Sequence, residues 1–190
     1  TRAADPLFIG LCIHENAQVG NKVVWRAHKS EKVGVTVEID GKMEILEYSE
    51  IPSDLADAED DSGKLKYGAA NICNHYLSVE FIEEILPKLN NVYHVCKKKI
   101  PYFDNVTNTT IKPEAVNGYK FELFIFDIFP FATRWTVMEV DRVDEFAPIK
   151  NAPGSASDGP EHAVAMLNTQ WKKWLSNHNA TISDKGDGIL

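Results

Sequence analysis

The chain has 190 residues, a formal net charge of −8 and a sequence pI of about 5.2. Its length suits one large domain or two small ones, and it can bury a sizeable core. The acidic balance, with basic residues only in short runs such as Lys97–Lys99, argues against a broad surface for nucleic acid or for an anionic membrane. No apolar run approaches the roughly 20 residues of a membrane-spanning helix. We therefore expect neither a nucleic acid nor a membrane as a partner.

The cysteines Cys12, Cys73 and Cys96 are far apart in the sequence. They form no CxxC pair and have no nearby histidine at zinc-ligand spacing, so they predict no metal site. An odd number of separated cysteines is typical of reduced thiols, which favours a cytoplasmic protein. The N-terminal residues show no signal-peptide pattern and lack an initiator Met, which indicates a piece of a longer chain.

The N-terminal residues predict a short helix and a strand. Asp5 is a suitable N-cap, and Pro6 suits the first helical position because its missing amide proton is not needed there. The helix is expected to end near Gly20. Residues 22–25, KVVW, then suit a strand.

A hairpin, a loop and a helix are predicted next. Asp40-Gly41 lies between two runs of strand-forming residues, so an antiparallel hairpin is expected near residues 33–50. Residues 52–66 are polar and acidic, which predicts an exposed connection with a helical turn. Ser78 as N-cap and apolar residues at helical spacing predict a helix over residues 78–89.

The segment 120–132, KFELFIFDIFPFA, concentrates five phenylalanines in eleven positions. Its apolar residues recur at helical spacing, which predicts a helix with one face in the core. Phe124 and Phe126 are two residues apart and cannot both point to that core. One of them is therefore expected to face a groove or a neighbouring element.

The last third of the chain predicts a strand, a loop and a terminal helix. Residues 135–140, WTVMEV, suit a strand, and residues 141–160 are rich in turn formers. Residues 161–175 have an amphipathic pattern and predict a helix that packs through its apolar face. The polar residues 177–190 are expected to fray. Together these elements predict an α/β or α+β layered domain.

No self-contained catalytic motif, such as a Gly-rich phosphate loop, is present. Glu47 and Tyr48 follow the second hairpin strand, where a carboxylate beside an aromatic ring could bind sugar hydroxyls, although the solubility of an edge strand also explains Glu47. Asn71 and Asn74 are polar candidates, although helix capping accounts for one of them. Lys150 precedes a loop and could meet a phosphate, although most loop lysines only face solvent.

Several segments, taken in order, resemble one family. They are ADPLFIGLCI, KVGV, EYSEI, GAANICNHYLSVEF, KKIPY, IKPEAVNGYKFELFIFDIFPFA and EVDRVDEFAPIKNA, from about residue 3 to residue 175. Their order and spacing are similar to those of eukaryotic UDP-N-acetylglucosamine (UDP-N-acetylhexosamine) pyrophosphorylases. The resemblance implies part of a Rossmann-like α/β fold, the nucleotide-diphospho-sugar transferase fold, built around a mixed sheet.

The resemblance also implies an activity. Members of the family join UTP and N-acetylglucosamine 1-phosphate to give UDP-N-acetylglucosamine and pyrophosphate, with magnesium as cofactor. Carried over position by position, it implies that Lys150 is a catalytic residue that meets the phosphate. The implied sugar-binding residues are Gly34, Glu47, Tyr48, Asn71, Phe124 and Phe126.

The sequence departs from the family pattern at its start. The Gly-rich nucleotide loop GGxGTRLG and the Asp-containing segment that organises the metal are not among these residues. We therefore expect the magnesium ligands to lie largely outside this chain. Residues 1–176 are expected to be the sugar-binding part of the catalytic domain and residues 177–190 a polar tail, without turnover by this piece alone.

Two other functions stay open at this point. A non-catalytic sugar-nucleotide-binding module would begin near Thr1, whereas the parent chain of an enzyme would carry the Gly-rich loop. A glucose-1-phosphate uridylyltransferase fits less well, because EYSE followed by NICNH resembles the N-acetylhexosamine branch. The N-acetylglucosamine and N-acetylgalactosamine 1-phosphates differ only at the C4 hydroxyl, so both remain candidates, and no oligomeric state is predicted.

Overall fold

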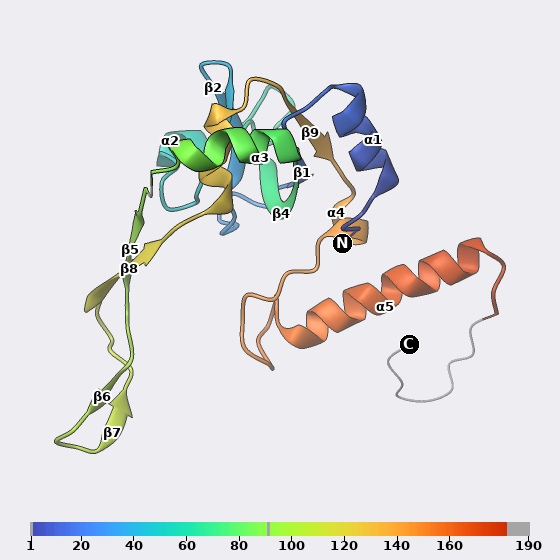
Figure 1. Ribbon diagram of the computed structural model, residues 1–190. Helices are drawn as coiled ribbons and strands as arrows, with labels where there is room; N and C mark the ends of the chain where they lie inside the picture. The colour runs from blue at the N-terminus through green and yellow to red at the C-terminus, as the bar shows by residue number, and fades with distance from the viewer. Residues whose placement is uncertain (1, 91, 182–190) are drawn as a thin grey trace.

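A five-stranded mixed sheet in the order β3-β2-β4-β1-β9 forms the centre of the computed structural model, which describes residues 2–90 and 92–181 (Figure 1). The strands are β1 (Val19–Trp25), β2 (Val35–Ile39), β3 (Lys42–Leu46), β4 (Ala69–Leu77) and β9 (Trp135–Glu139). Strand β1 pairs antiparallel with β4 and parallel with β9. The sheet is therefore mixed, as predicted, and β1 is the strand that has one antiparallel and one parallel neighbour.

The predicted hairpin near residues 33–50 is confirmed. Strands β2 and β3 pair antiparallel, with Ile39 opposite Lys42. The two residues between them, Asp40 and Gly41, have φ values of 51° and 76°. A two-residue turn with positive φ at both positions matches the twist of the flanking strands, and Asp-Gly tolerates it well.

The described residues form five helices, of which the last one in the chain lies apart from the sheet (Figure 1). They are α1 (Pro6–His14), α2 (Ser53–Ala56), α3 (Val79–Ile85), α4 (Arg142–Glu145) and α5 (Pro160–Asn177). The Asp5 carboxylate accepts a hydrogen bond from the Leu7 amide at 3.1 Å, and the Ser78 hydroxyl accepts one from the Phe81 amide at 3.2 Å, as their cap positions predict. None of the described helices is both long and apolar enough to cross a membrane.

Helix α1 ends at His14, earlier than predicted, because Gly20 already belongs to β1. A Cβ atom at Gly20 would lie 2.5 Å from the Cys12 sulfur and 3.1 Å from the Phe8 ring. Glycine at this position lets the helix pack directly onto the strand. The glycine thus marks a close contact between two elements and not a helix terminus.

Helix α3 also ends earlier than the sequence indicates. It stops at Ile85 and continues as a 3-10 turn, η1 (Leu86–Lys88). Pro87 has no amide proton to continue the α-helical hydrogen-bond pattern. The predicted loop over residues 52–66 is confirmed together with its single helical turn, α2.

The aromatic segment is not the predicted α-helix. Its first part belongs to strand β8 (Gly118–Glu122), and the rest forms a 3-10 helix, η2 (Ile125–Phe131). The buried residues Phe126, Phe129 and Ala132 recur every third position, which is the period of a 3-10 helix. Phe121 and Phe131 are largely exposed. The core face was therefore predicted with the wrong period.

The main core lies between one face of the sheet, α3 and η2. Its buried members are Val19, Met43, Ile45, Phe81, Ile85, Phe126, Phe129 and Ala132. Phe129 is fully buried and meets the ring of His75 edge-on at 5.0 Å. Burial lowers the pKa of His75 to about 4, so this imidazole is neutral at physiological pH and acts as a packing group.

A second centre of the fold is a buried ion cluster around Lys22. Its ammonium lies 2.7 Å from the Asp5 carboxylate and 3.0 Å from the Glu145 carboxylate, and it is fully buried. The hydrogen bond from Lys22 is the main reason that the pKa of Asp5 is lowered, against the opposing effect of burial. The cluster joins α1, β1 and α4.

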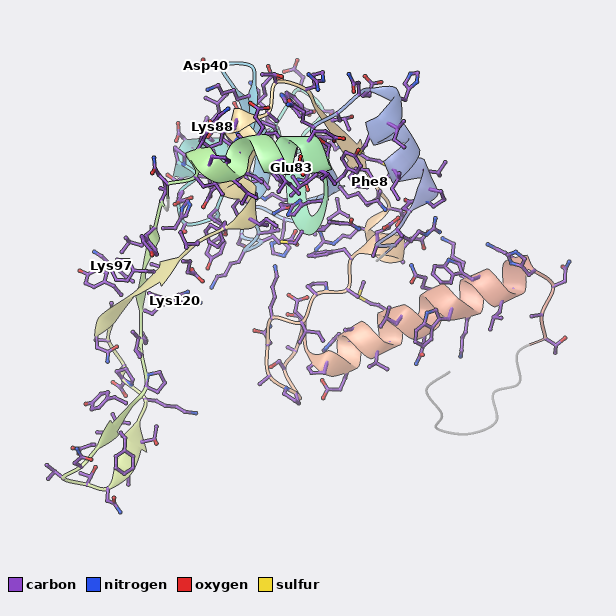
Figure 2. The ribbon with its side chains drawn as sticks, viewed as in Figure 1. Phe8, Asp40, Glu83, Lys88, Lys97 and Lys120 are labelled. Atoms are coloured by element: carbon purple, nitrogen blue, oxygen red, sulfur yellow. The ribbon has the colours of Figure 1, made fainter. Side chains whose placement is uncertain are left out.

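A long two-stranded arm projects from the body and was not predicted (Figure 1). Strand β5 (His94–Lys98) pairs antiparallel with β8, and the tip is a hairpin of β6 (Tyr102–Asp104) and β7 (Thr109–Ile111). Lys97 and Lys120 project from the two strands of this arm (Figure 2). The arm begins and ends beside the aromatic segment.

The terminal helix is confirmed, but its packing differs from the prediction. Ala163 and Gln170 are the buried residues of α5, whereas Trp174 and Leu175 remain 37% and 40% exposed. The helix is joined to α4 by hydrogen bonds from Gln170 and Lys173 to Asp144. Of the predicted polar tail 177–190, residues 182–190 lie outside the described residues.

Candidate functional site

Three of the predicted site residues meet at the edge of the sheet. A Cβ atom at Gly34 would lie 2.8 Å from Oε1 of Glu47 and 3.0 Å from Cγ2 of Ile45. The Gly34 carbonyl accepts a hydrogen bond from the Asn71 amide at 2.8 Å. Gly34 therefore provides the space that the Glu47 carboxylate occupies, and its own carbonyl is hydrogen-bonded to strand β4.

Asn71 lies within β4, so the prediction that Asn71 or Asn74 caps a helix is wrong. Between Asn71 and Asn74 the pairing with β1 skips Ile72 and Cys73, and Cys73 has a φ of 56°. The Asn71 Oδ1 accepts a hydrogen bond from the Cys73 amide at 3.0 Å. The Asn71 carboxamide therefore supports a β-bulge, a feature that is frequent beside functional sites because it redirects side chains.

Glu47 is a half-buried carboxylate with unusual electrostatics. Burial raises its pKa, and the neighbouring carboxylates of Glu50 and Glu122 raise it further, while His94 and Lys150 act in the opposite direction. No described residue donates a hydrogen bond to its side chain. A half-buried carboxylate of this kind can accept hydrogen bonds from the hydroxyls of a ligand.

Phe124 and Phe126 do not point to opposite sides, as the helical pattern had indicated. Their rings are stacked, with centroids 4.8 Å apart and an interplanar angle of 14°. Phe126 is buried in the core, and Phe124 lies in front of it and lines a cavity of about 210 Å³ together with Glu47 and Tyr48. Phe124 is extended and precedes the 3-10 helix, which allows both rings to lie on one side.

His94 stands at the other side of this cavity and was not predicted. It is the first residue of β5, and its ring lies 4.7 Å from the ring of Phe124. Its Nδ1 is 2.8 Å from Glu50, and its Nε2 is 2.9 Å from Asp127. Asp127, the acidic residue inside the aromatic segment, also accepts a hydrogen bond from the Phe124 amide at 3.1 Å. The arm and the aromatic segment are thus joined at the cavity.

Lys150 lines a second cavity of about 720 Å³, on the other side of Tyr48, which contributes to both cavities. Its ammonium donates a hydrogen bond to the Lys32 carbonyl at 2.7 Å, and its amide donates one to the Asp158 carbonyl at 2.8 Å. The loop that follows Lys150 is thereby folded back on it. The lysine is exposed, and its ammonium is anchored by the Lys32 carbonyl at the wall of this cavity.

Arg142 adds a second cation to this cavity. The two terminal nitrogens of its guanidinium donate hydrogen bonds to the two carboxylate oxygens of Glu31, at 2.5 and 3.2 Å. Burial alone would raise the pKa of Glu31, but the hydrogen bonds from Arg142 and the Ala27 amide, together with the charges of Arg142 and Lys150, lower it. The cavity walls also include Lys32. The carboxylates of Glu31 and Asp158 line it as well, so its three cationic residues exceed its acidic residues by one, and this excess suits an anionic group such as a phosphate.

The structure thus brings together most of the predicted site residues. Gly34, Glu47 and Asn71 form one cluster, and Phe124 shares a cavity with Glu47 and Tyr48. Phe126 lies behind Phe124 and lines neither of the two cavities. Lys150 lies in the adjoining cavity. Sequence reasoning missed His94 and Arg142, since no residue pattern marks a histidine that two distant carboxylates approach only in the fold.

No metal centre is present among residues 2–90 and 92–181, where no group of three or more His, Cys, Asp or Glu side chains could hold an ion. Two of the acidic side chains that line the cavities are engaged with cationic partners, Glu31 with Arg142 and Glu50 with His94. The described residues therefore do not fit a complete magnesium site.

The α/β fold around the mixed sheet is that of the UDP-sugar pyrophosphorylases of known structure. The family model described as UTP–glucose-1-phosphate uridylyltransferase matches residues 1–185, and the chain belongs to this family. Its α/β fold is that of the family's solved structures. A crystal structure of uridine diphosphate N-acetylglucosamine pyrophosphorylase from Trypanosoma brucei, in complex with an inhibitor, has a TM-score of 0.75 and 37% identity over 92% of this chain.

Within this family, the chain is similar to curated relatives that are named for N-acetylated sugars. UDP-N-acetylhexosamine pyrophosphorylase-like protein 1 of Xenopus tropicalis is 42% identical over 177 residues, which are 91% of this chain and 34% of the relative. UDP-N-acetylglucosamine pyrophosphorylase of Saccharomyces cerevisiae is 39% identical over 194 residues, which are 100% of this chain and 40% of the relative. The predicted resemblance is confirmed. The chain spans only 34% to 40% of the length of these relatives.

Proposed function

We propose that this chain forms the sugar-phosphate-binding part of a UTP:N-acetylglucosamine-1-phosphate uridylyltransferase, which makes UDP-N-acetylglucosamine and pyrophosphate. The observation that carries the proposal is the half-buried Glu47 carboxylate beside Gly34, with an aromatic wall on one side and a cationic cavity on the other. This is the combination that a sugar phosphate requires. The names of the relatives support the acetamido sugar as substrate.

The proposed roles follow from the chemistry of each side chain. Glu47 accepts hydrogen bonds from sugar hydroxyls, and Asn71 contributes a donor and an acceptor from the bulge. Phe124 provides apolar surface for the methyl group of the N-acetyl substituent, and Phe126 supports it from behind. Tyr48, between the two cavities, marks the junction of sugar and phosphate.

The proposed reaction is an in-line displacement at the α-phosphorus of UTP. An oxygen of the sugar phosphate forms a bond to this phosphorus, while the bond from the α-phosphorus to the bridging oxygen of the β-phosphate breaks. Pyrophosphate leaves with the electron pair. No covalent intermediate on the protein is needed, so the chain positions the sugar phosphate and compensates charge. Lys150 is proposed to neutralise part of the negative charge on the sugar phosphate.

Magnesium belongs to the proposal as a cofactor of the complete enzyme. It would supply further charge neutralisation on the UTP phosphates. Its ligands, and the nucleotide loop, would come largely from residues outside this chain. Residues 1–176 are proposed as the sugar-binding part of that catalytic domain. A cytoplasmic location is supported by the cysteines Cys12, Cys73 and Cys96, which are all unpaired.

A glucose-1-phosphate uridylyltransferase is the second candidate, favoured by the description of the family model. The two functions differ in whether the apolar surface of Phe124 meets an acetamido methyl group. A non-catalytic sugar-nucleotide-binding module would bind the same ligands without releasing pyrophosphate.

The test measures pyrophosphate release by the full-length protein with UTP and three sugar 1-phosphates: N-acetylglucosamine, N-acetylgalactosamine and glucose. We expect release with an acetamido sugar, a loss of about 100-fold or more in kcat/KM for Lys150→Ala, and no release by the 190-residue chain alone. Lys88→Ala, which removes an exposed lysine paired with Glu84, is the matched control and should be unchanged. Faster turnover of glucose 1-phosphate would favour the second candidate, and binding without release would favour the third.

A further inference from the structure

His94 is placed between the two segments that carry the proposed sugar-binding residues. One carboxylate neighbour, Glu50, belongs to the turn after β3, and the other, Asp127, belongs to η2. The distances from the ring nitrogens are 2.8 Å and 2.9 Å, so both nitrogens are in hydrogen-bond range. The side chain is 23% exposed. The imidazole is thus a bridge between two segments that are far apart in the sequence.

Each of the two carboxylates leads directly to a sugar-site residue. The Glu50 amide donates a hydrogen bond to the Glu47 carbonyl at 2.8 Å, which closes the turn that presents Glu47 and Tyr48. The second oxygen of Asp127 accepts the Phe124 amide at 3.1 Å. The His94 ring itself contacts the Phe124 ring, with centroids 4.7 Å apart and an angle of 47°. Hydrogen bonds therefore run from His94 to both walls of the cavity.

The bridge depends on the protonation of the ring, because only the imidazolium has two N–H donors. Burial disfavours this form, but the hydrogen bonds to Glu50 and Asp127 outweigh burial and raise the pKa of His94. The other charged groups facing the site are Glu47, Glu122 and Lys98, and Glu122 is paired with Lys120. The carboxylates surround the ring from the turn after β3, from β8 and from η2.

We propose that His94 is a positioning residue for the sugar phosphate: its imidazolium fixes the Glu47–Tyr48 turn and Phe124 at their correct separation. This inference rests on the proposed function and adds a residue outside the implied sugar-binding set. His94 does not need to touch the substrate. A substitution of His94 leaves the side chains of Glu47 and Phe124 unaltered but lets the two walls of the cavity move apart. Binding of the sugar phosphate is weakened, whereas binding of UTP is not.

The experiment compares the full-length wild-type protein with His94→Ala and His94→Gln in steady-state kinetics with UTP and N-acetylglucosamine 1-phosphate. We expect the KM for the sugar phosphate to rise about tenfold or more in His94→Ala, as for the loss of charge-assisted hydrogen bonds, with the KM for UTP unchanged within about twofold. The single amide nitrogen of Gln can reach only one of the two carboxylates, so the KM of His94→Gln for the sugar phosphate should lie between those of the wild type and His94→Ala. His14→Ala, which removes a histidine that is 83% exposed on α1, should match the wild type.

The KM for the sugar phosphate as a function of pH distinguishes this role of His94 from a merely structural one. In the wild type the KM for the sugar phosphate should rise as the pH increases through the raised pKa of His94, where the second donor is lost. In His94→Ala this dependence should be absent. His94→Arg restores a permanent cation with several donors, and it should recover at least part of the affinity at high pH.

The outcomes separate this inference from the function on which it rests. A wild type that releases pyrophosphate while His94→Ala has an unchanged KM for the sugar phosphate overturns the role of His94 alone. Equal rises in both KM values also overturn it, because they indicate general disorder. If His94→Ala does not fold, Glu50→Gln and Asp127→Asn test the same bridge and should each raise the sugar KM. A wild type without turnover of any sugar phosphate removes the proposed function, and the inference with it.

Discussion

The carboxylate of Glu47 occupies the space that a side chain at Gly34 would take: a Cβ atom at Gly34 would lie 2.8 Å from Oε1 of Glu47. The glycine is required here by a neighbour and not by its own backbone angles. Gly34 ends the connection between β1 and β2, and Glu47 is the residue that follows β3, so the contact joins these two places in the fold. A change at Gly34 therefore acts on Glu47.

Gly34→Ala is expected to displace the Glu47 carboxylate and to weaken binding of the sugar 1-phosphate by about tenfold or more, since a misplaced polar group loses its hydrogen bonds to the ligand. Titration calorimetry of the full-length protein with the sugar phosphate measures this. Gly10→Ala in α1 is the matched control, because no atom lies within 4 Å of a Cβ atom there. The control should keep its affinity and gain about 0.5–1 kcal/mol in helix stability. Unchanged affinity in Gly34→Ala would contradict the placement of Glu47 in the site.

Glu47→Gln is expected to weaken sugar binding while stabilising the fold at neutral pH. Burial and two neighbouring carboxylates raise the pKa of Glu47, so ionisation of this group costs more in the folded state than in the unfolded state. That cost is absent at acidic pH, below the unfolded pKa, and is complete once the pH has passed the folded pKa. The difference in melting temperature between Glu47→Gln and the wild type should therefore grow as the pH rises through this range. Thermal unfolding as a function of pH checks the sign, and a difference that shrinks with rising pH would refute it.

Lys22→Met is expected to cost about 3–5 kcal/mol of unfolding free energy, because it leaves the buried carboxylates of Asp5 and Glu145 without their shared cation. Urea denaturation measures the loss. Lys88→Met, at an exposed pair with Glu84, should change stability by less than about 1 kcal/mol.

The same ion cluster predicts an acid limit. The pKa of Asp5 is lowered in the folded state, chiefly by the hydrogen bond from Lys22, so its contribution is present above the unfolded pKa and is lost as the pH falls through the folded pKa. Asp5→Asn should flatten this part of the pH–stability curve. A curve with the same slope at acid pH in wild type and variant would show that other carboxylates dominate.

Phe129→Ala and Phe131→Ala test the difference in burial between two rings of the aromatic segment. Phe129 is fully buried, so its truncation should cost about 3–5 kcal/mol. Phe131 is 51% exposed, and its truncation should cost less than about 1 kcal/mol. Chemical denaturation of both variants gives the comparison, and equal costs would contradict this difference in burial.

Local signals predicted those elements whose cause is local. Asp5 and Ser78 begin helices because their side chains accept amide protons from the first turn, and Asp40-Gly41 turns a hairpin because both residues tolerate positive φ. These features depend on a few consecutive residues. The sequence therefore contained enough information to place them correctly.

The errors arose where partners distant in the sequence decide the structure. Helical spacing placed Phe129 on the core face and Phe126 away from it. The core formed by Met43, Ile45 and Phe81 receives both rings, on the three-residue period of a 3-10 helix. Asn71 looked like a cap because its bulge exists only in pairing with β1. The site residues came from the family resemblance, whereas His94 became visible only once Glu50 and Asp127 were brought to either side of it.

The arm and the cavity share their residues. Strand β5 begins at His94, and strand β8 ends at Glu122, two positions before Phe124. Between those points the chain leaves the body and returns, so the base of the arm is also the rim of the cavity. Any change in the pairing of β5 with β8 therefore also changes the wall of the cavity, because His94, Cys96 and Glu122 belong to both.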